Sequence, residues 1–345
     1  MKKISKLYEL EKEDNTTRVY FFDNLKYVLI LLVILGHLFE IYYDKSHVMK
    51  AGFNFIYLFH MPLFIWISGY FSKKFKPEKI LNFFLLCFLS LFLMRTLETL
   101  VLNKPFNYNF LSFQSASWYL FALALYNISL PLIKNFKKQY VITFSVLFAL
   151  YVGYVVSVKD LFIASRTIVF YPFFLLGYYS SIEDVKKVVK PKYFLVSLLG
   201  VITIFLLFYF FKDLYILRGL FTGRNSYKTV FGDYYMYGAL IRLVYYIASL
   251  ITMIMIMNIV PKCEMLLSKY GARTLQIYIL QMFALFFIKN TSIKTNLETL
   301  GILLPICLLI IAFLLSVLLG NKIFSKPFNY ISSLKWKFLK VENNQ

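Results

Sequence analysis

The sequence predicts an all-α fold, a polytopic membrane helix bundle with about ten transmembrane helices. Sixty per cent of the 345 residues are hydrophobic, which is more than a soluble core of this length can bury. The apolar residues come in blocks of roughly 17–23, the length that crosses about 30 Å of hydrocarbon. Tyrosine and phenylalanine are abundant, with 28 and 38 copies, and tyrosine is favoured at membrane interfaces.

Taken in order, the apolar blocks predict ten spanning segments. They run roughly over residues 25–43, 53–71, 80–102, 117–133, 140–157, 161–180, 193–211, 237–257, 272–289 and 301–319. Residues 1–24 mix Lys with Glu and Asp, so they are expected to form a cytosolic N-terminal lead-in and not a secretory signal peptide. Residues 25–319 would then form the transmembrane domain, and residues 320–345 a basic cytosolic tail.

Lysines in alternate connections predict the orientation of these segments. They cluster after the second, fourth and sixth segments and in the tail: Lys73, Lys74, Lys76, Lys79; Lys134, Lys137, Lys138; Lys186, Lys187, Lys190, Lys192; Lys322, Lys326, Lys335, Lys337 and Lys340. The connection after the third segment has Lys104 alone. Because basic loops stay in the cytosol, both termini are expected there, in the cytoplasmic membrane. The net charge of +21 is explained in this way, and no nucleic-acid partner is expected.

One connection departs from this pattern. Because successive connections alternate between the two sides of the membrane, the stretch 212–236 is expected on the side away from the cytosol. It nevertheless carries Arg218, Arg224 and Lys228. It is either a solvated loop or a partly re-entrant segment that contacts an anionic or sugar-bearing ligand. The sequence leaves both interpretations open.

The first segment carries titratable residues along one stripe. Lys26 and His37 are eleven residues apart, or three helical turns plus about 20°, so they share a face. Glu40 lies three residues beyond His37, within side-chain reach, and Asp23 lies where it can cap the helix. A carboxylate beside a histidine fixes its tautomer and raises its basicity, so the pair indicates acid–base chemistry.

Structural roles are the alternative for each of these residues. Lys26 could extend to the headgroups, Asp23 could serve only as a cap, and His37 could make a structural hydrogen bond. The depth of His37 favours function, because a polar ring there must face protein or water and not lipid.

Later segments add further polar groups. His60 precedes Pro62, so it is expected near a kink, while Ser68-Gly69 permits close helix approach. Arg95 is expected to pair with Glu98 at i, i+3. Trp118 opens the fourth segment, Arg166 the sixth, and Arg242 lies inside the eighth. Each charged residue could be a structural tie between helices, but together they predict a polar cavity within the bundle.

Several other chemistries have no support in the sequence. There is no phosphate-binding loop, no dinucleotide glycine fingerprint and no His-Glu-x-x-His pair. The three cysteines have no paired spacing, so neither a disulfide framework nor a metal site is expected.

Five blocks of sequence follow one another over more than two hundred residues. They are Arg18-Val-Tyr-Phe-Phe-Asp23-Asn24-Leu-Lys26 through Gly36-His37, Phe59-His60-Met61-Pro62-Leu63-Phe64 with Ser68-Gly69-Tyr70, Trp118-Tyr119-Leu120, Arg166 with Phe170-Tyr-Pro-Phe-Phe-Leu-Leu-Gly177-Tyr178-Tyr179, and Arg242 with Gly271-Ala-Arg-Thr274-Leu-Gln-Ile-Tyr278-Ile-Leu. In this order they resemble the acyltransferase-3 family of integral membrane proteins, most closely the branch of fucose 4-O-acetylases and related acetyltransferases. One departure is Gln281, where relatives often have histidine.

The resemblance implies transfer of an acetyl group from cytosolic acetyl-CoA to a hydroxyl of a cell-surface or exported glycan. It places the catalytic histidine at His37 and the basic partner of the family's Arg/Lys-x10-His pattern at Lys26. Arg18 and Asp23 hold the polar positions before it. No permanently bound cofactor is expected, since acetyl-CoA is a cosubstrate.

Combining residues and resemblance, we expect His37, with Glu40 or Asp23 in support, to act as general base or acyl carrier. The residues expected to bind substrate are Arg18, His60, Arg95, Trp118, Arg166, Arg242 and Gln281. The lipid bilayer, acetyl-CoA and a glycan are the expected partners, with a homo-oligomer or an envelope-glycan synthesis complex as further options. The main alternative is a transporter or flippase for an anionic or glycan substrate, and a non-catalytic scaffold is the other.

Overall fold

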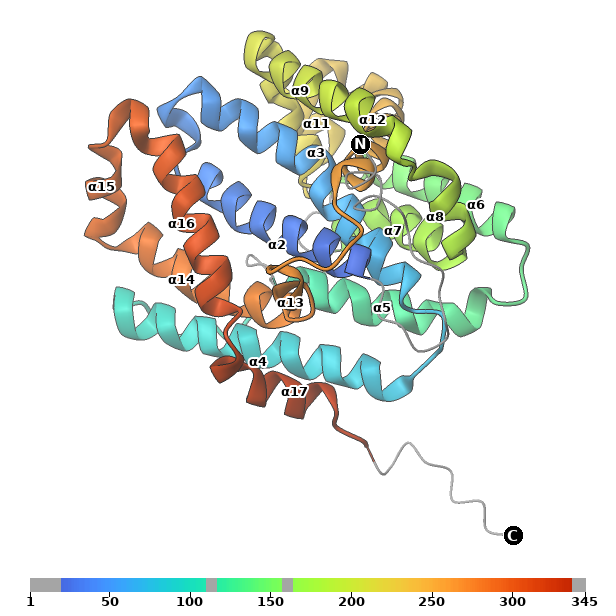
Figure 1. The fold of residues 1–345 in the computed structure, drawn as a ribbon, viewed down its shortest axis with the longest axis horizontal. Coiled ribbons are helices and arrows are strands. Elements are labelled where there is room, and N and C mark those ends of the chain that lie inside the picture. The colour runs from blue at the N-terminus through green and yellow to red at the C-terminus, as the bar shows by residue number, and fades with distance from the viewer. Residues whose placement is uncertain (1–19, 110–116, 157–163, 337–345) are drawn as a thin grey trace.

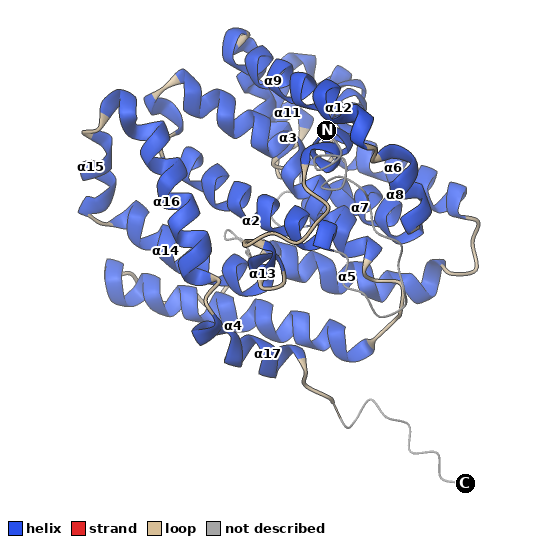
Figure 2. Ribbon diagram, in the orientation of Figure 1, coloured by secondary structure: helices blue, strands red, loops and turns tan. Residues whose placement is uncertain are grey.

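The chain folds into a bundle of helices, seen in a computed structural model that describes residues 20–109, 117–156 and 164–336. Helices make up the regular structure of this part, which has no strands (Figure 2). The long helices are α2 (Tyr20–Ile41), α3 (His47–Tyr70), α4 (Pro77–Leu102), α5 (Trp118–Ile133), α6 (Lys138–Val152), α7 (Ala164–Tyr179), α9 (Phe194–Phe210), α12 (Gly238–Ile259), α14 (Thr274–Asn290) and α16 (Leu304–Leu319). Each overlaps one predicted segment, and the predicted all-α membrane bundle is confirmed.

Short helices occupy the connections and the C-terminal part. They are η1 (Tyr43–Lys45), α8 (Ile182–Val188), η3 (Pro191–Tyr193), η4 (Lys212–Leu217), α10 (Arg218–Phe221), α11 (Tyr227–Phe231), η5 (Gly232–Tyr237), α13 (Ser268–Gly271), α15 (Ser292–Glu298), η6 (Gly301–Leu303), η7 (Lys322–Phe324) and α17 (Ser325–Ser332). Within the described ranges, six helices are long and apolar enough to cross a membrane. Helices α5, α6 and α14 are apolar but shorter.

Helices α2 and α3 form the centre of the bundle (Figure 1). Helix α3 packs against α2, α7, α9 and α12, and α2 also contacts α13, α14 and α16. Within its apolar window, α3 is 89% buried, whereas α9 is 11% and α16 22% buried. The outer helices therefore present apolar side chains such as Leu199, Phe144 and Leu314 outward. An apolar surface of this extent is suited to lipid and not to water.

Helices α3 and α7 approach each other closely. A methyl group on Gly69 would overlap the backbone carbonyl of Phe174, and one on Gly177 would overlap that of Trp66. The two glycines thus let the backbones touch, as the small Ser68-Gly69 pair predicts.

Pro62 removes one backbone hydrogen bond within α3, and another helix compensates for it. Proline has no N–H to donate to the carbonyl four residues earlier, which belongs to Leu58. The Ser249 hydroxyl of α12 donates to that carbonyl instead. His60, two residues before the proline, is buried, and its Nδ1 donates to the Ile56 carbonyl at 2.7 Å. The α3 backbone is therefore satisfied in the middle of the bundle.

Two lysines outside the membrane-spanning segments cap the C-terminal ends of helices. The Lys73 ammonium donates to the carbonyls of Gly177 and Ser180 at the end of α7, and burial lowers its pKa. The Lys262 ammonium donates to the carbonyls of Met257 and Asn258 at the end of α12. Burial lowers the pKa of Lys262 to about 8. Cations at helix C-termini satisfy the last carbonyls and complement the helix dipole.

Candidate active site

A cavity of about 1030 Å³ opens into one end of the bundle. Its walls come from the second half of α2, the middle of α3, the end of α4, the starts of α5 and α7, segment 218–224 and α14. Along α14 the lining runs from Tyr278 to Asn290, or roughly 18 Å at 1.5 Å per residue. Tyr278 and Gln281 therefore lie at its floor, with Lys289 and Asn290 near its mouth.

The cavity brings together most of the residues that the sequence nominated. His37, Glu40, His60, Arg95, Trp118, Arg166 and Gln281 all line it. They come from six separate helices, so only the tertiary fold makes them neighbours. The predicted polar cavity is therefore present.

Three nominated residues lie elsewhere, and a fourth cannot be placed. Asp23 and Lys26 form an ion pair at 2.8 Å near the start of α2. Because α2 begins at Tyr20, Asp23 belongs to the first turn and is not the expected N-cap. Arg242 is fully buried, donates to the Ala149 carbonyl at 2.8 Å and does not line the cavity. Arg18 lies outside the residues that the structure describes.

The stripe predicted along α2 is therefore divided into two pairs. Asp23 lies fourteen residues before His37, or roughly 21 Å along the helix, too far to support the imidazole. Of the two carboxylates expected to support His37, only Glu40 contacts it in the structure. Neither Lys26 nor Asp23 lines this cavity. A catalytic role for either residue remains a prediction.

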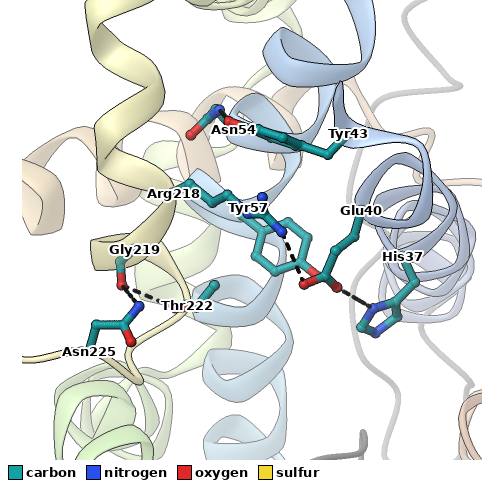
Figure 3. Close-up of polar contacts among 9 residues, drawn as sticks. All are labelled: His37, Glu40, Tyr43, Asn54, Tyr57, Arg218, Gly219, Thr222 and Asn225. Atoms are coloured by element: carbon teal, nitrogen blue, oxygen red, sulfur yellow. Dashed lines mark hydrogen bonds and ion pairs between the residues drawn. The ribbon is translucent and has the colours of Figure 1, made fainter. Parts of the chain in front are cut away.

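His37 and Glu40 form the polar centre of the cavity wall (Figure 3). His37 Nδ1 lies 3.4 Å from Glu40 Oε2, as the i, i+3 spacing predicts. Because a carboxylate can only accept, Nδ1 carries the proton in this contact. The other ring nitrogen, Nε2, is then left with its lone pair, and the half-buried ring borders the cavity. A histidine held in this tautomer is suited to accept a proton at Nε2.

Tyr57 and Arg218 hold Glu40 in place. The Tyr57 hydroxyl donates to Glu40 Oε2 at 3.3 Å and lies 3.3 Å from His37 Nδ1. An Arg218 guanidinium nitrogen lies 3.6 Å from Glu40 Oε1, and the guanidinium covers the Tyr43 ring at 4.1 Å. One cation and two hydrogen-bond donors thus surround the Glu40 carboxylate beside the imidazole.

The stretch 212–236 is folded and not a free loop. Leu220 and Phe221 are buried, and the Gly223 carbonyl accepts from the Ser165 hydroxyl of α7 at 2.7 Å. Asn225 and Thr222 both donate to the Gly219 carbonyl, which shapes the turn. This segment brings Arg218, Thr222 and Arg224 to the cavity. Residues 218–224 thus lie at the cavity, as the interpretation of a ligand-contacting segment requires, whereas residues 232–237 are exposed.

Sequence reasoning did not nominate Tyr57, Arg218 or Arg224 as site residues. The two arginines gave a signal, because they broke the charge alternation of the connections. Tyr57 gave none, since it is one of many aromatic residues in an apolar segment. The expected pair between Arg95 and Glu98 is present in the cavity wall, with 3.0 Å between Nη1 and Oε2.

Comparison with known proteins places these residues in a family. A family model described as an acyltransferase domain matches residues 19–321. Nodulation protein NolL of Sinorhizobium fredii is 47% identical over 55 residues, which is 15% of this chain and 15% of that protein. NolL of Mesorhizobium japonicum matches to the same extent. The chain thus matches about 15% of the length of these curated relatives, and no solved structure matches it.

Proposed function

The chain belongs to the family of membrane acyltransferases whose domain spans residues 19–321, and we propose that it transfers an acetyl group from acetyl-CoA to a hydroxyl of a cell-surface or exported glycan. The observation that carries this proposal is the His37–Glu40 pair in the wall of a polar cavity within a membrane bundle. O-acyl transfer needs a base for the acceptor hydroxyl, and this pair is suited to be that base.

In the proposed reaction, His37 Nε2 removes the proton of the acceptor hydroxyl as its oxygen attacks the thioester carbonyl. The carbon–sulfur bond then breaks, and the coenzyme A thiolate leaves with the proton from His37. Glu40 accepts the Nδ1–H hydrogen bond throughout and stabilises the imidazolium that forms. Tyr57 and Arg218 act as positioning residues, because they fix Glu40. The alternative course, in which Nε2 first carries the acetyl group, uses the same tautomer.

The arrangement of the cavity supports a route from the cytosol to the opposite face. If both termini are cytosolic, α2, α4, α5 and α7 contribute to the cavity the half that is farther from the cytosol, α3 contributes its middle, and α14 contributes most of its length. At the other end of α3 and α7, a second recess of about 630 Å³ is lined by Lys73, Lys74, Lys76 and Lys79. We propose that these lysines attract the phosphates of coenzyme A. Tyr70 lines this recess and Met61 lines the cavity. They are nine residues apart on α3, or roughly 14 Å along the helix, and the pantetheine arm of coenzyme A can span that distance.

The proposal is tested by acetyl transfer from labelled acetyl-CoA to the glycan fraction of isolated membranes. We expect His37→Ala to reduce labelling by roughly 10²–10⁴-fold, the usual contribution of general base catalysis. His47→Ala is the matched control, because His47 is exposed and does not line the cavity. It should label like the wild type. A labelled protein that accumulates without acceptor would identify the acyl-carrier course.

Two outcomes would contradict the proposal. Equal labelling by His37→Ala and the wild type would remove His37 from the chemistry while keeping the enzyme. No labelling by a folded wild-type protein, with glycan present and acetyl-CoA unconsumed, would favour the transporter.

A further inference from the structure

The cavity carries more positive charge than its own carboxylates neutralise. Its basic residues are Arg95, Lys104, Arg166, Arg218, Arg224 and Lys289, and its carboxylates are Glu40 and Glu98. Both carboxylates are already engaged, Glu40 by His37, Tyr57 and Arg218, and Glu98 by Arg95. In the described part of the chain, Lys104, Arg166, Arg224 and Lys289 have no carboxylate within ion-pair distance.

Arg166 is a cation of the cavity wall that, unlike Arg218, has no carboxylate of the described residues within ion-pair distance. It lies at the start of α7 with its guanidinium over the Trp118 ring at 5.0 Å. Glu40, Tyr57 and Arg224 line the same cavity and interact electrostatically with this guanidinium, Glu40 favourably and Arg224 by repulsion. The Nε atom of Arg166 is buried and donates to no group of the described chain. Two like charges thus face the same enclosed space beside the His37–Glu40 pair.

Gln281 adds an independent observation at the cavity floor. Its side chain is 0% exposed, and neither its amide nitrogen nor its amide oxygen has a hydrogen-bond partner in the described residues. A buried amide without hydrogen-bond partners destabilises the fold. A native bundle keeps such a group only where something else satisfies it, and here the amide borders the cavity.

These donors match an anion of the substrate. Unpaired guanidinium groups within a membrane protein are unfavourable until an anion joins them, and arginine binds carboxylate or phosphate with paired hydrogen bonds. The phosphates of coenzyme A are not suited to this position, because the pantetheine arm holds them far from the thioester. A group that reaches both His37 and Arg166 must be bound close to the reacting hydroxyl, and so belongs to the acceptor.

We propose that the acceptor is an acidic glycan, whose carboxylate or phosphate is bound by Arg166 and Arg224 with the Gln281 amide beside them. This inference rests on the proposed acetyl transfer, and it specifies the chemical class of the acceptor. A sugar with its acidic group on or beside the acetylated residue would place the hydroxyl at His37 Nε2.

The test measures both substrates in membranes with Arg166→Gln and Arg224→Gln, using acetyl-CoA and the membrane glycan. We expect the KM for glycan to rise at least ~10-fold, the loss of one charge-assisted hydrogen bond. The KM for acetyl-CoA should stay unchanged. Arg166→Lys and Arg224→Lys should raise the KM for glycan less than the glutamine variants do, because lysine keeps the positive charge. Lys228→Gln, in the same segment but exposed and outside the cavity, is the matched control. Thermal unfolding in detergent checks that each variant is folded.

The product provides a second readout. The labelled glycan is digested, and anion-exchange chromatography shows whether the acetylated fragment is acidic. An acidic fragment with a glycan-specific KM effect supports the proposal. A neutral fragment overturns it, as does a rise in the KM for acetyl-CoA alone, which would assign the anion to the donor. Wild-type membranes without any labelling would instead refute the acetyl transfer on which it rests.

Discussion

Glu40 is the residue that organises the candidate active site. One of its oxygens accepts from His37 and Tyr57, and the other faces Arg218. These partners come from the same helix, from the neighbouring helix α3 and from a segment about 180 positions away. The site thus depends on a carboxylate that one helix supplies and two others hold in place. Its negative charge matters most when the imidazole becomes positive during proton transfer.

We therefore expect Glu40→Gln to lower kcat by roughly 10–10²-fold with little change in KM, because the imidazolium loses its counter-charge while the shape is kept. Initial rates of acetyl transfer from acetyl-CoA check this. Glu183→Gln is the control, since Glu183 also pairs with a cation at i, i+3 but lies exposed on α8. A Glu40→Gln enzyme with the wild-type kcat would show that the carboxylate is only structural.

Helix α3 is the element on which the site is built. It supplies Tyr57 and His60 to the cavity and contacts α2, α7, α9 and α12. Its contact with α7 depends on Gly69 and Gly177, and α7 carries Arg166 into the same cavity. The crossing of these two helices therefore sets the distance between the histidine side of the site and the proposed anion site.

Gly177→Ala tests this crossing. The added methyl would overlap the backbone of Trp66, which cannot move aside like a flexible side chain. We expect a loss of about 1–3 kcal/mol of stability, typical of overpacking. Thermal or denaturant unfolding in detergent measures it.

Gly200→Ala in α9 is the matched control for that change. Its new methyl would meet the flexible end of Met255 at 2.6 Å, and alanine is the better helix former. Its stability should equal or slightly exceed the wild type. Equal unfolding midpoints for Gly177→Ala and the wild type would show that the two helices can separate at no cost.

At the scale of the whole molecule, charge and cavity indicate one orientation. The lysine-rich connections and the recess of Lys73, Lys74, Lys76 and Lys79 lie at one end of the helices. The large cavity is lined by the other ends of α2, α4, α5 and α7, together with the middle of α3 and most of α14. By the positive-inside rule, we expect the recess to face the cytosol and the cavity to face away from it.

Cysteine labelling tests this orientation in a chain whose Cys87, Cys263 and Cys307 have been replaced by serine. We expect Lys228→Cys to react with a membrane-impermeant maleimide in intact cells. Lys74→Cys should react only after the membrane is opened. The cysteine-free chain gives the background. Reaction of Lys74→Cys in intact cells would reverse the orientation and place the cavity on the cytosolic side.

The sequence by itself determined the fold class, the places of the long helices and the pairs that lie close along one helix. His37–Glu40 and Arg95–Glu98 were predictable because helical periodicity fixes i, i+3 neighbours whatever the surroundings. The apolar blocks were equally local, since crossing a bilayer requires a helix of set length.

Only the tertiary structure decided which polar groups share the cavity. Lys26 and His37 lie on one helix, but the cavity borders only the second half of that helix. Arg242 looked like a ligand residue in sequence, yet packing places it against the Ala149 carbonyl. Tyr57 and Arg218 join Glu40 through the packing of α3 and the folding-in of segment 212–236. Such contacts depend on how helices cross, and an apolar segment of sequence does not encode its rotation about its own axis.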